Sequence, residues 1–206
     1  MIGRSRRDAG QAFPIYMMMV AGLLFLVFAF FAVGKAAALR NGAQGAADAA
    51  ALAAAQQTRE DFGAPFLASL PGNMLQQFLQ VHEVTGCPAA QGLAAANQAD
   101  IVSPGGCQPT RAGLYRDRIT VNVKGRKPVN SSVLPGSEET RAKAKATAIV
   151  EFRCIRWKAF DFNDDGDQDL YIFPCGDAGV VKIEPSNPPP WSEVKKRLYD
   201  VRLVDN

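Results

Sequence analysis

The stretch FPIYMMMVAGLLFLVFAFFAV, residues 13–33, is almost wholly apolar and contains no charged side chain. A helix of about 20 such residues, rising roughly 1.5 Å per residue, covers a hydrocarbon core of about 30 Å. We therefore expect one transmembrane helix here, with the lipid bilayer as its first partner. The alternative is a cleaved signal peptide with a small-residue cleavage site near Gly34. This run is longer than the usual apolar region of a signal peptide, which favours a retained anchor.

Basic residues flank the apolar stretch on both sides: Arg4, Arg6 and Arg7 precede it, and Lys35 and Arg40 follow it. The positive-inside rule weakly favours a cytoplasmic N-terminus. We expect residues 1–12 to form a cytoplasmic tail of the membrane protein and everything beyond the span to be extracytoplasmic.

Four cysteines, all C-terminal to the span, support this orientation. They are even in number and form no close CxxC pair, which favours disulfides over zinc and a location outside the reducing cytoplasm. Three pairings are open. We favour Cys87 with Cys107 and Cys154 with Cys175, because each pair brackets one local loop or hairpin.

An alanine-rich segment, residues 34–62, follows the span and contains no proline, so the helix is expected to continue through it. Small residues let helix backbones approach closely, so Gly42 and Gly45 are candidate helix-packing positions. Asp48 is a third candidate, as a polar residue that would set the register between two packed helices. The alternative is a spacer helix with a solvated stripe. An alanine surface offers little area to bury, so we expect the rod to gain little by folding onto its own domain.

The stretch from Ala9 to Gln57, and above all ADAAALAAA at residues 47–55, resembles the N-terminus of TadG- and TadE-like proteins of bacterial tight-adherence (Flp-type) pilus systems. The resemblance implies a pilin-like membrane helix, an extracytoplasmic domain and a role in pilus assembly. Prepilins of the type IV kind are cut after a glycine and carry glutamate at the fifth mature position. Here Gly10 is followed at that position by Ile15, which agrees better with a protein that keeps its anchor.

Residues 63–206 are expected to form a small disulfide-bonded α+β domain with an antiparallel sheet. Apolar and polar residues alternate around residues 119–123 and 146–152, as in half-buried strands, and residues 171–173, 180–183 and 201–204 are shorter candidates. Residues 74–84 and 192–199 are expected to be helical. The Gly- and Pro-rich run 86–109 is expected to be a loop.

One acidic segment has the spacing of a calcium loop. Oxygen-bearing side chains alternate around a glycine and could converge on a hard cation. They are Asp161, Asn163, Asp165, Asp167 and Asp169. The twelfth position, which holds a bidentate glutamate in an EF-hand, is Ile172, so a weak extracellular type of Ca2+ site is expected, and the alternative is an acidic hairpin turn without metal.

Composition and motifs exclude other classes of function. The net charge of +3, from 23 basic and 20 acidic residues, is too balanced for a nucleic-acid surface. His82 is the only histidine, lacks recognisable catalytic partners and is expected on a helix surface. The sequence thus predicts a non-enzymatic, membrane-anchored component of a pilus or related secretion machine, whose partners are other membrane subunits or copies of itself. The alternative is an anchored extracytoplasmic binding module that forms no filament.

Overall fold

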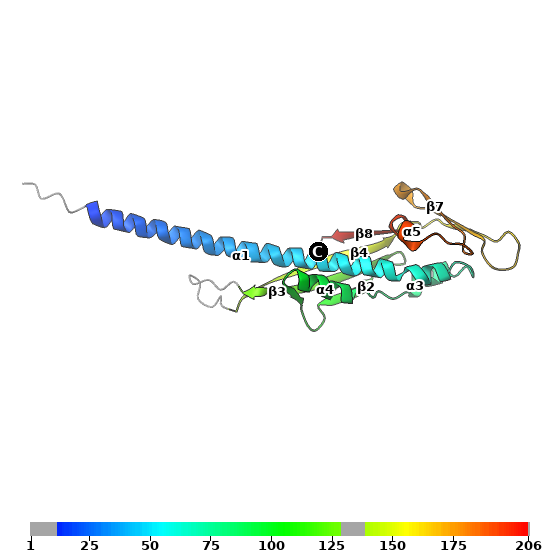
Figure 1. The fold of residues 1–206 in the computed structure, drawn as a ribbon, viewed down its shortest axis with the longest axis horizontal. Helices are drawn as coiled ribbons and strands as arrows, with labels where there is room; N and C mark the ends of the chain where they lie inside the picture. The colour runs from blue at the N-terminus through cyan, green and yellow to red at the C-terminus, as the bar shows by residue number, and fades with distance from the viewer. Residues whose placement is uncertain (1–11, 129–138, 206) are drawn as a thin grey trace, which may run out of the picture.

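The computed structural model describes residues 12–128 and 139–205, and its dominant element is one long helix. Helix α1 (Ala12–Asp61) runs without a break, and the rest of the chain gathers around its C-terminal half (Figure 1). The architecture is α+β, with a long apolar N-terminal helix and an antiparallel sheet, as the sequence predicts.

The larger sheet has five strands within the described residues. They are β1 (Ala99–Ile101), β2 (Cys107–Arg111), β3 (Arg116–Pro128), β4 (Arg141–Phe152) and β8 (Tyr199–Val204). The order is β1-β3-β4-β8, β2 also pairs with β3, and all pairings are antiparallel. A smaller antiparallel sheet of β5 (Lys158–Phe160), β6 (Leu170–Pro174) and β7 (Val180–Ile183) lies near the far end of the molecule (Figure 1).

Short helices complete the domain: α2 (Gly63–Ala68), α3 (Leu75–Val81), α4 (Cys87–Ala96) and α5 (Trp191–Leu198), with a 3-10 turn at Gly176–Ala178. The prediction of a loop over residues 86–109 was wrong, because this run contains α4 and two strands. Pro88 lies in the first turn, where a missing N–H costs nothing, and alanines carry the helix onward. Ala90 and Ala94 of α4 are fully buried, and α4 packs on α1.

The C-terminal half of α1 is part of the domain's hydrophobic core. Its buried residues recur every three to four positions, so they form one face that packs on β3, β4, β8 and α4. They are Ala43, Ala46, Ala47, Ala50, Ala51, Ala54, Ala55 and Thr58. The expectation that this rod gains little by folding onto its own domain was wrong, because the small side chains let the helix backbone itself lie close to the sheet and to α4.

Close approach is most extreme at Gly86. A Cβ atom at this residue would lie 1.9 Å from the carbonyl oxygen of Ala54. Gly86 also donates its backbone N–H to the hydroxyl of Thr58 at 3.1 Å. Only glycine fits where the start of α4 crosses α1.

An aromatic cluster closes the core at the end of α1. Phe62 and Phe66 contact rings from α3 and its C-cap His82, β4, β6, α5 and β8, with centroid separations between 4.5 and 6.2 Å. The smaller sheet is tied to the same region, because the Tyr171 hydroxyl donates to the carbonyl of Leu70 at 2.9 Å. Burial raises the pKa of Tyr171 to about 12.

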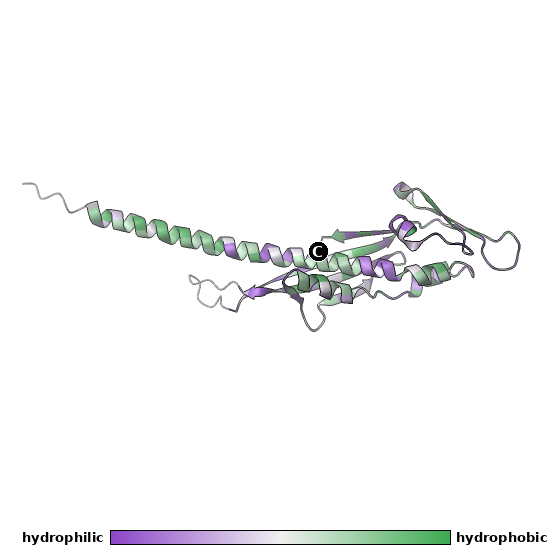
Figure 2. Cartoon of the chain, in the orientation of Figure 1, coloured by the Kyte–Doolittle hydropathy of each residue, from purple (hydrophilic) through white to green (hydrophobic). Residues whose placement is uncertain are grey.

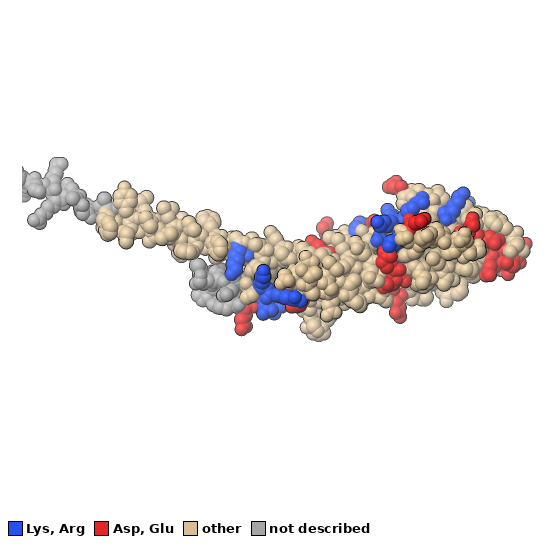
Figure 3. All heavy atoms as spheres, in the orientation of Figure 1, with Lys and Arg blue, Asp and Glu red and all other residues tan. Residues whose placement is uncertain are grey.

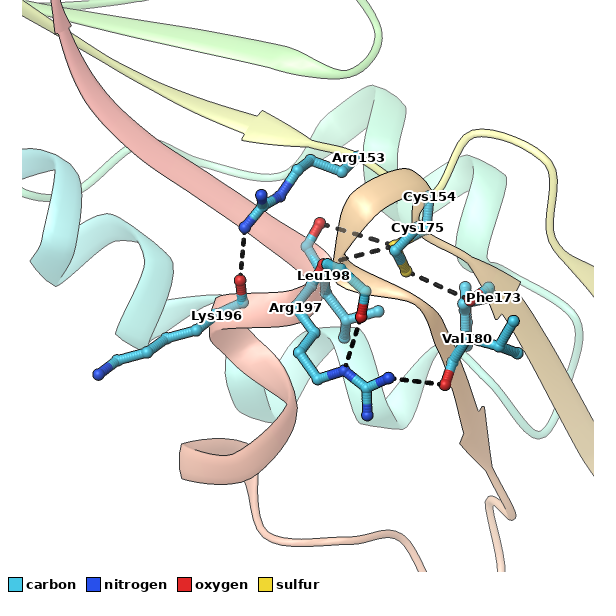
Figure 4. The surroundings of a disulfide bond; sticks show 9 residues. Arg153, Cys154, Phe173, Cys175, Val180, Lys196, Arg197 and Leu198 are labelled. Carbon is cyan, nitrogen blue, oxygen red and sulfur yellow. Dashed lines mark hydrogen bonds between the residues drawn. A yellow bond between two sulfur atoms is a disulfide. The ribbon is translucent and has the colours of Figure 1, made fainter.

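Both predicted disulfides are present and have the favoured pairing. Cys87–Cys107 joins the start of α4 to β2, and Cys154–Cys175 joins the end of β4 to the end of β6. Around the second bond, Arg197 of α5 donates to the carbonyls of Ala178 and Val180 at 3.1 and 2.8 Å (Figure 4). The disulfide and this arginine together hold α5, β4 and the smaller sheet in one unit.

Candidate membrane anchor and its junction with the domain

The N-terminal half of α1 projects away from the domain and is mostly hydrophobic (Figure 2). Its large apolar side chains are exposed. Phe13, Met18 and Phe30 expose 71%, 79% and 75% of their surface. In the described part of the chain, α1 is the one helix long and apolar enough to cross a membrane. Exposure of this apolar surface to water would cost much free energy, and a lipid bilayer would remove that cost by covering it. The predicted tail, residues 1–12, lies outside the described residues apart from Ala12.

The predicted helix-packing residues lie just beyond this apolar half. Gly42 and Gly45 are exposed, and a Cβ atom at either would meet nothing within 4 Å. Gly42 borders a shallow hollow of about 140 Å³ between α1 and the ends of β3 and β4. Asp48 is half-buried and accepts a hydrogen bond of 2.8 Å from Gln44, whose amide also donates to the carbonyl of Lys145 at 3.3 Å. Packing of these residues against a second helix stays a prediction.

Basic side chains gather where α1 enters the domain (Figure 3). They come from three elements that are distant in sequence, namely α1, the end of β3 and the start of β4. The exposed ones are Lys35, Arg40, Lys124, Arg126, Lys127, Arg141, Lys143 and Lys145. Arg126 pairs with Asp100 at 2.7 Å, and this hydrogen bond lowers the pKa of the Asp100 carboxyl. No local sequence pattern reveals this group, because the register between β3 and β4 brings its members together.

The opposite end of the same sheet carries paired charges. Glu151 lies between Arg116 and Arg202, and Arg202 also pairs with Asp200. Burial would raise the pKa of Glu151, but hydrogen bonds from Arg116 and Arg202 outweigh it and lower the pKa overall. The carboxylates Glu151 and Asp200 at this end are therefore paired with arginines of the same sheet.

His82 is not the surface residue that the sequence predicts. Its ring is packed between Phe62 and Phe78, and its side chain is only 6% exposed. Nδ1 faces the carbonyl of Phe78 at 3.1 Å, and Nε2 lies 2.7 Å from the Asp117 carboxylate, which is 4% exposed. His82 Nε2 and Asp117 Oδ2 satisfy each other, whereas Asp117 Oδ1 is buried with no hydrogen-bond partner among the described residues. The pair ties the end of α3 to β3.

The acidic loop forms hydrogen bonds within itself. Asp161 accepts backbone N–H groups from Asp164 at 2.8 Å and Gly166 at 3.0 Å, and Asp165 accepts from Asp167 at 2.9 Å. Gly166 has a φ of 93°, which suits the sharp turn. Among the described residues, no group of three or more His, Cys, Asp or Glu side chains is placed to hold a metal ion. Calcium binding by this loop stays a prediction.

Comparison with known families identifies the N-terminal segment. Residues 10–57 match a family model described as Tad, putative Flp pilus-assembly TadE/G-like. This segment resembles TadE/G-like proteins. The match confirms the resemblance predicted from the sequence and supports a Flp-pilus-associated role and a single-pass membrane anchor. It ends within α1, so the TadE/G-like segment consists of the anchor and most of the alanine face. No curated protein and no solved structure matches the chain.

Proposed function

We propose that the chain is a membrane-anchored, non-enzymatic component of tight-adherence (Flp-type) pilus assembly or of a related secretion machine. The observation that carries this proposal is the family match over residues 10–57. This segment includes the apolar anchor and most of the alanine face that packs into the core of the domain. The N-terminus is cytoplasmic and the domain is extracytoplasmic. Two disulfides in the domain support that orientation, because cytosolic thiols are kept reduced.

The proposed division of the chain follows the apolar pattern. Residues 1–12 are the cytoplasmic tail, 13–33 the membrane span, 34–62 the alanine-rich extension and 63–206 the extracytoplasmic domain. The buried alanine face supports a rigid connection between the last two, because a helix packed into a core cannot swing freely. A force or displacement in the membrane would then be transmitted directly to the domain.

Contacts with other subunits use the side of α1 that its own sheet leaves open. The buried alanine face is occupied within the chain, so the available surface is the apolar span and the exposed side with Gly42 and Gly45. Small residues at these two positions permit close approach of a second helix. The partner is another membrane subunit of the machine or a second copy of this chain.

Cross-linking tests this surface. Gly45→Cys places a thiol on the exposed side of α1 with room for its Cβ, and Ser186→Cys places one on an exposed residue far from α1 in sequence. Oxidation of native membranes is expected to give dimers or ladders with Gly45→Cys and monomers with Ser186→Cys. Monomers from both variants would contradict helix packing at this surface.

Gene deletion in the native host tests the cellular role. Loss of surface pili, restored by the full chain and not by the domain without residues 1–33, supports the assembly role. Cells that keep normal pili after deletion would favour the alternative function, an anchored extracytoplasmic binding module that forms no filament.

A further inference from the structure

We propose that the basic surface at the junction of α1 and the domain binds the phosphate groups of anionic phospholipids in the membrane that holds the anchor. We name it the junction surface and define it by Arg40 of α1, Lys124 and Lys127 of β3, and Arg141 and Lys143 of β4. The inference rests on the membrane anchor and does not depend on the pilus role.

The junction surface lies within electrostatic reach of the headgroup region. Lys127 and Ala142 border the same hollow as residues 38–43 of α1, so the ends of β3 and β4 lie beside that part of the helix. Residues 38–43 follow Val33 by about 7 to 15 Å along the helix axis, at roughly 1.5 Å per residue. Headgroups extend about 5 to 8 Å beyond the hydrocarbon core, and electrostatic attraction reaches about 10 Å further at 0.1 M salt.

Among the described residues, the junction surface has more basic than acidic side chains. Lys124 and Lys143 are direct partners in the register of β3 and β4, so two like charges lie side by side on one face of the sheet. Such a pair is destabilising unless an anion lies nearby. Lipid phosphates would supply that anion.

The described carboxylates near this end are few. Asp100 is engaged by Arg126, and Glu139 is exposed just before the start of β4. Asp48 and Asp205 border a separate hollow beside β8, about 22 Å beyond Val33 along the helix axis for Asp48. The opposite end of the sheet is different, since Glu151 and Asp200 there pair with arginines. Among the described residues, basic side chains thus outnumber acidic ones at the end that faces the bilayer.

Lysine acetylation of the full chain in nanodiscs tests the proposal without any substitution. In nanodiscs with about 30% phosphatidylglycerol, Lys124, Lys127 and Lys143 are expected to react at least about threefold more slowly than in phosphatidylcholine, and about 0.5 M NaCl is expected to remove the difference. The exposed lysines Lys158, Lys182 and Lys196 at the other end of the domain serve as internal controls and are expected to be unaffected.

Three outcomes would overturn the proposal. One is equal reaction rates in both lipids, and another is slowing at Lys35 alone, which the anchor by itself explains. The third is equal protection by inorganic phosphate in phosphatidylcholine nanodiscs, which would assign the surface to free phosphate.

Substitution of the lysines provides a second, independent test of lipid binding. The triple variant Lys124→Gln/Lys127→Gln/Lys143→Gln is expected to retain at least about threefold less phosphatidylglycerol in native mass spectrometry than the wild-type chain. The matched variant Lys158→Gln/Lys182→Gln/Lys196→Gln changes net charge equally and is expected to retain the wild-type amount. Equal retention by the two variants would contradict a lipid site at the junction surface.

Discussion

The two halves of α1 reverse the usual relation between hydrophobicity and burial. Residues 13–33 carry large apolar side chains and are almost wholly exposed, whereas residues 43–55 carry mostly alanine and form part of the core. The first half exposes an apolar surface that suits a bilayer, because a membrane span requires a long run of apolar side chains. The second half meets a sheet and another helix, where small side chains permit backbone contact. Residue size therefore separates the two environments along one continuous helix.

The strongest test of the domain half is Gly86→Ala. The added Cβ would lie 1.9 Å from a backbone oxygen of α1, and neither backbone can yield without separating α4 from α1. We expect the free energy of unfolding to fall by about 3 kcal/mol or more, at the upper end of overpacking effects. Urea unfolding of the full chain in detergent measures it. The control Gly92→Ala adds a methyl group at an open position in α4 and is expected to stabilise by about 0.5 to 1 kcal/mol. Equal effects of the two substitutions would contradict the close crossing.

The membrane half is tested by a charge at its centre. Leu24→Arg is expected to disfavour insertion by about 2.5 to 3.5 kcal/mol, because a guanidinium is costly in the bilayer core. Carbonate extraction of membranes should release the variant. Gln56→Arg introduces the same side chain on the exposed side of the domain half and should leave the protein in the pellet. Retention of both variants would mean that residues 13–33 do not span the bilayer.

The dependence on small size is tested by Ala50→Leu. Ala50 is completely buried, so three additional carbon atoms must displace the sheet or the helix, at a cost of about 1 to 3 kcal/mol. Thermal unfolding followed by near-UV circular dichroism measures the loss. Gln56→Leu places leucine on the exposed side and is expected to change stability by about 0.5 kcal/mol at most. A neutral Ala50→Leu would show that the alanine face does not require small residues.

The acidic loop stands outside both halves and gives the smallest expected effect. If it binds calcium with a dissociation constant of about 1 mM, then about 10 mM Ca2+ stabilises the domain by about 1.4 kcal/mol, since the ion binds only the folded state. The melting temperature in calcium and in chelator measures this for the wild-type chain and for Asp161→Asn. A wild-type chain with the same melting temperature in both conditions would leave the loop as a hydrogen-bonded turn.

Much of the secondary structure could be predicted from local patterns. The span, the strands around residues 119–123 and 146–152 and the helices near residues 74–84 and 192–199 all follow from hydrophobic periodicity, and the structure contains each. Helix α4 was missed because Gly86 before it and its own cysteine, proline and glycine resemble a loop. Its helical character depends on burying Ala90 and Ala94 against α1. His82 was misplaced for the same reason, because Asp117 is distant in sequence and only the fold brings them together.

The sequence by itself determined the properties that depend on neighbouring residues. Those are the membrane span, the continuous helix, the TadE/G-like segment and the even set of cysteines. Tertiary structure decided which surface the alanines pack against and which charged side chains lie next to one another. The junction surface combines residues near positions 40, 125 and 142, and it exists only because the register of β3 and β4 places their ends beside α1. Local periodicity fixes which face of an element is apolar, but contacts between distant segments depend on how those faces pack.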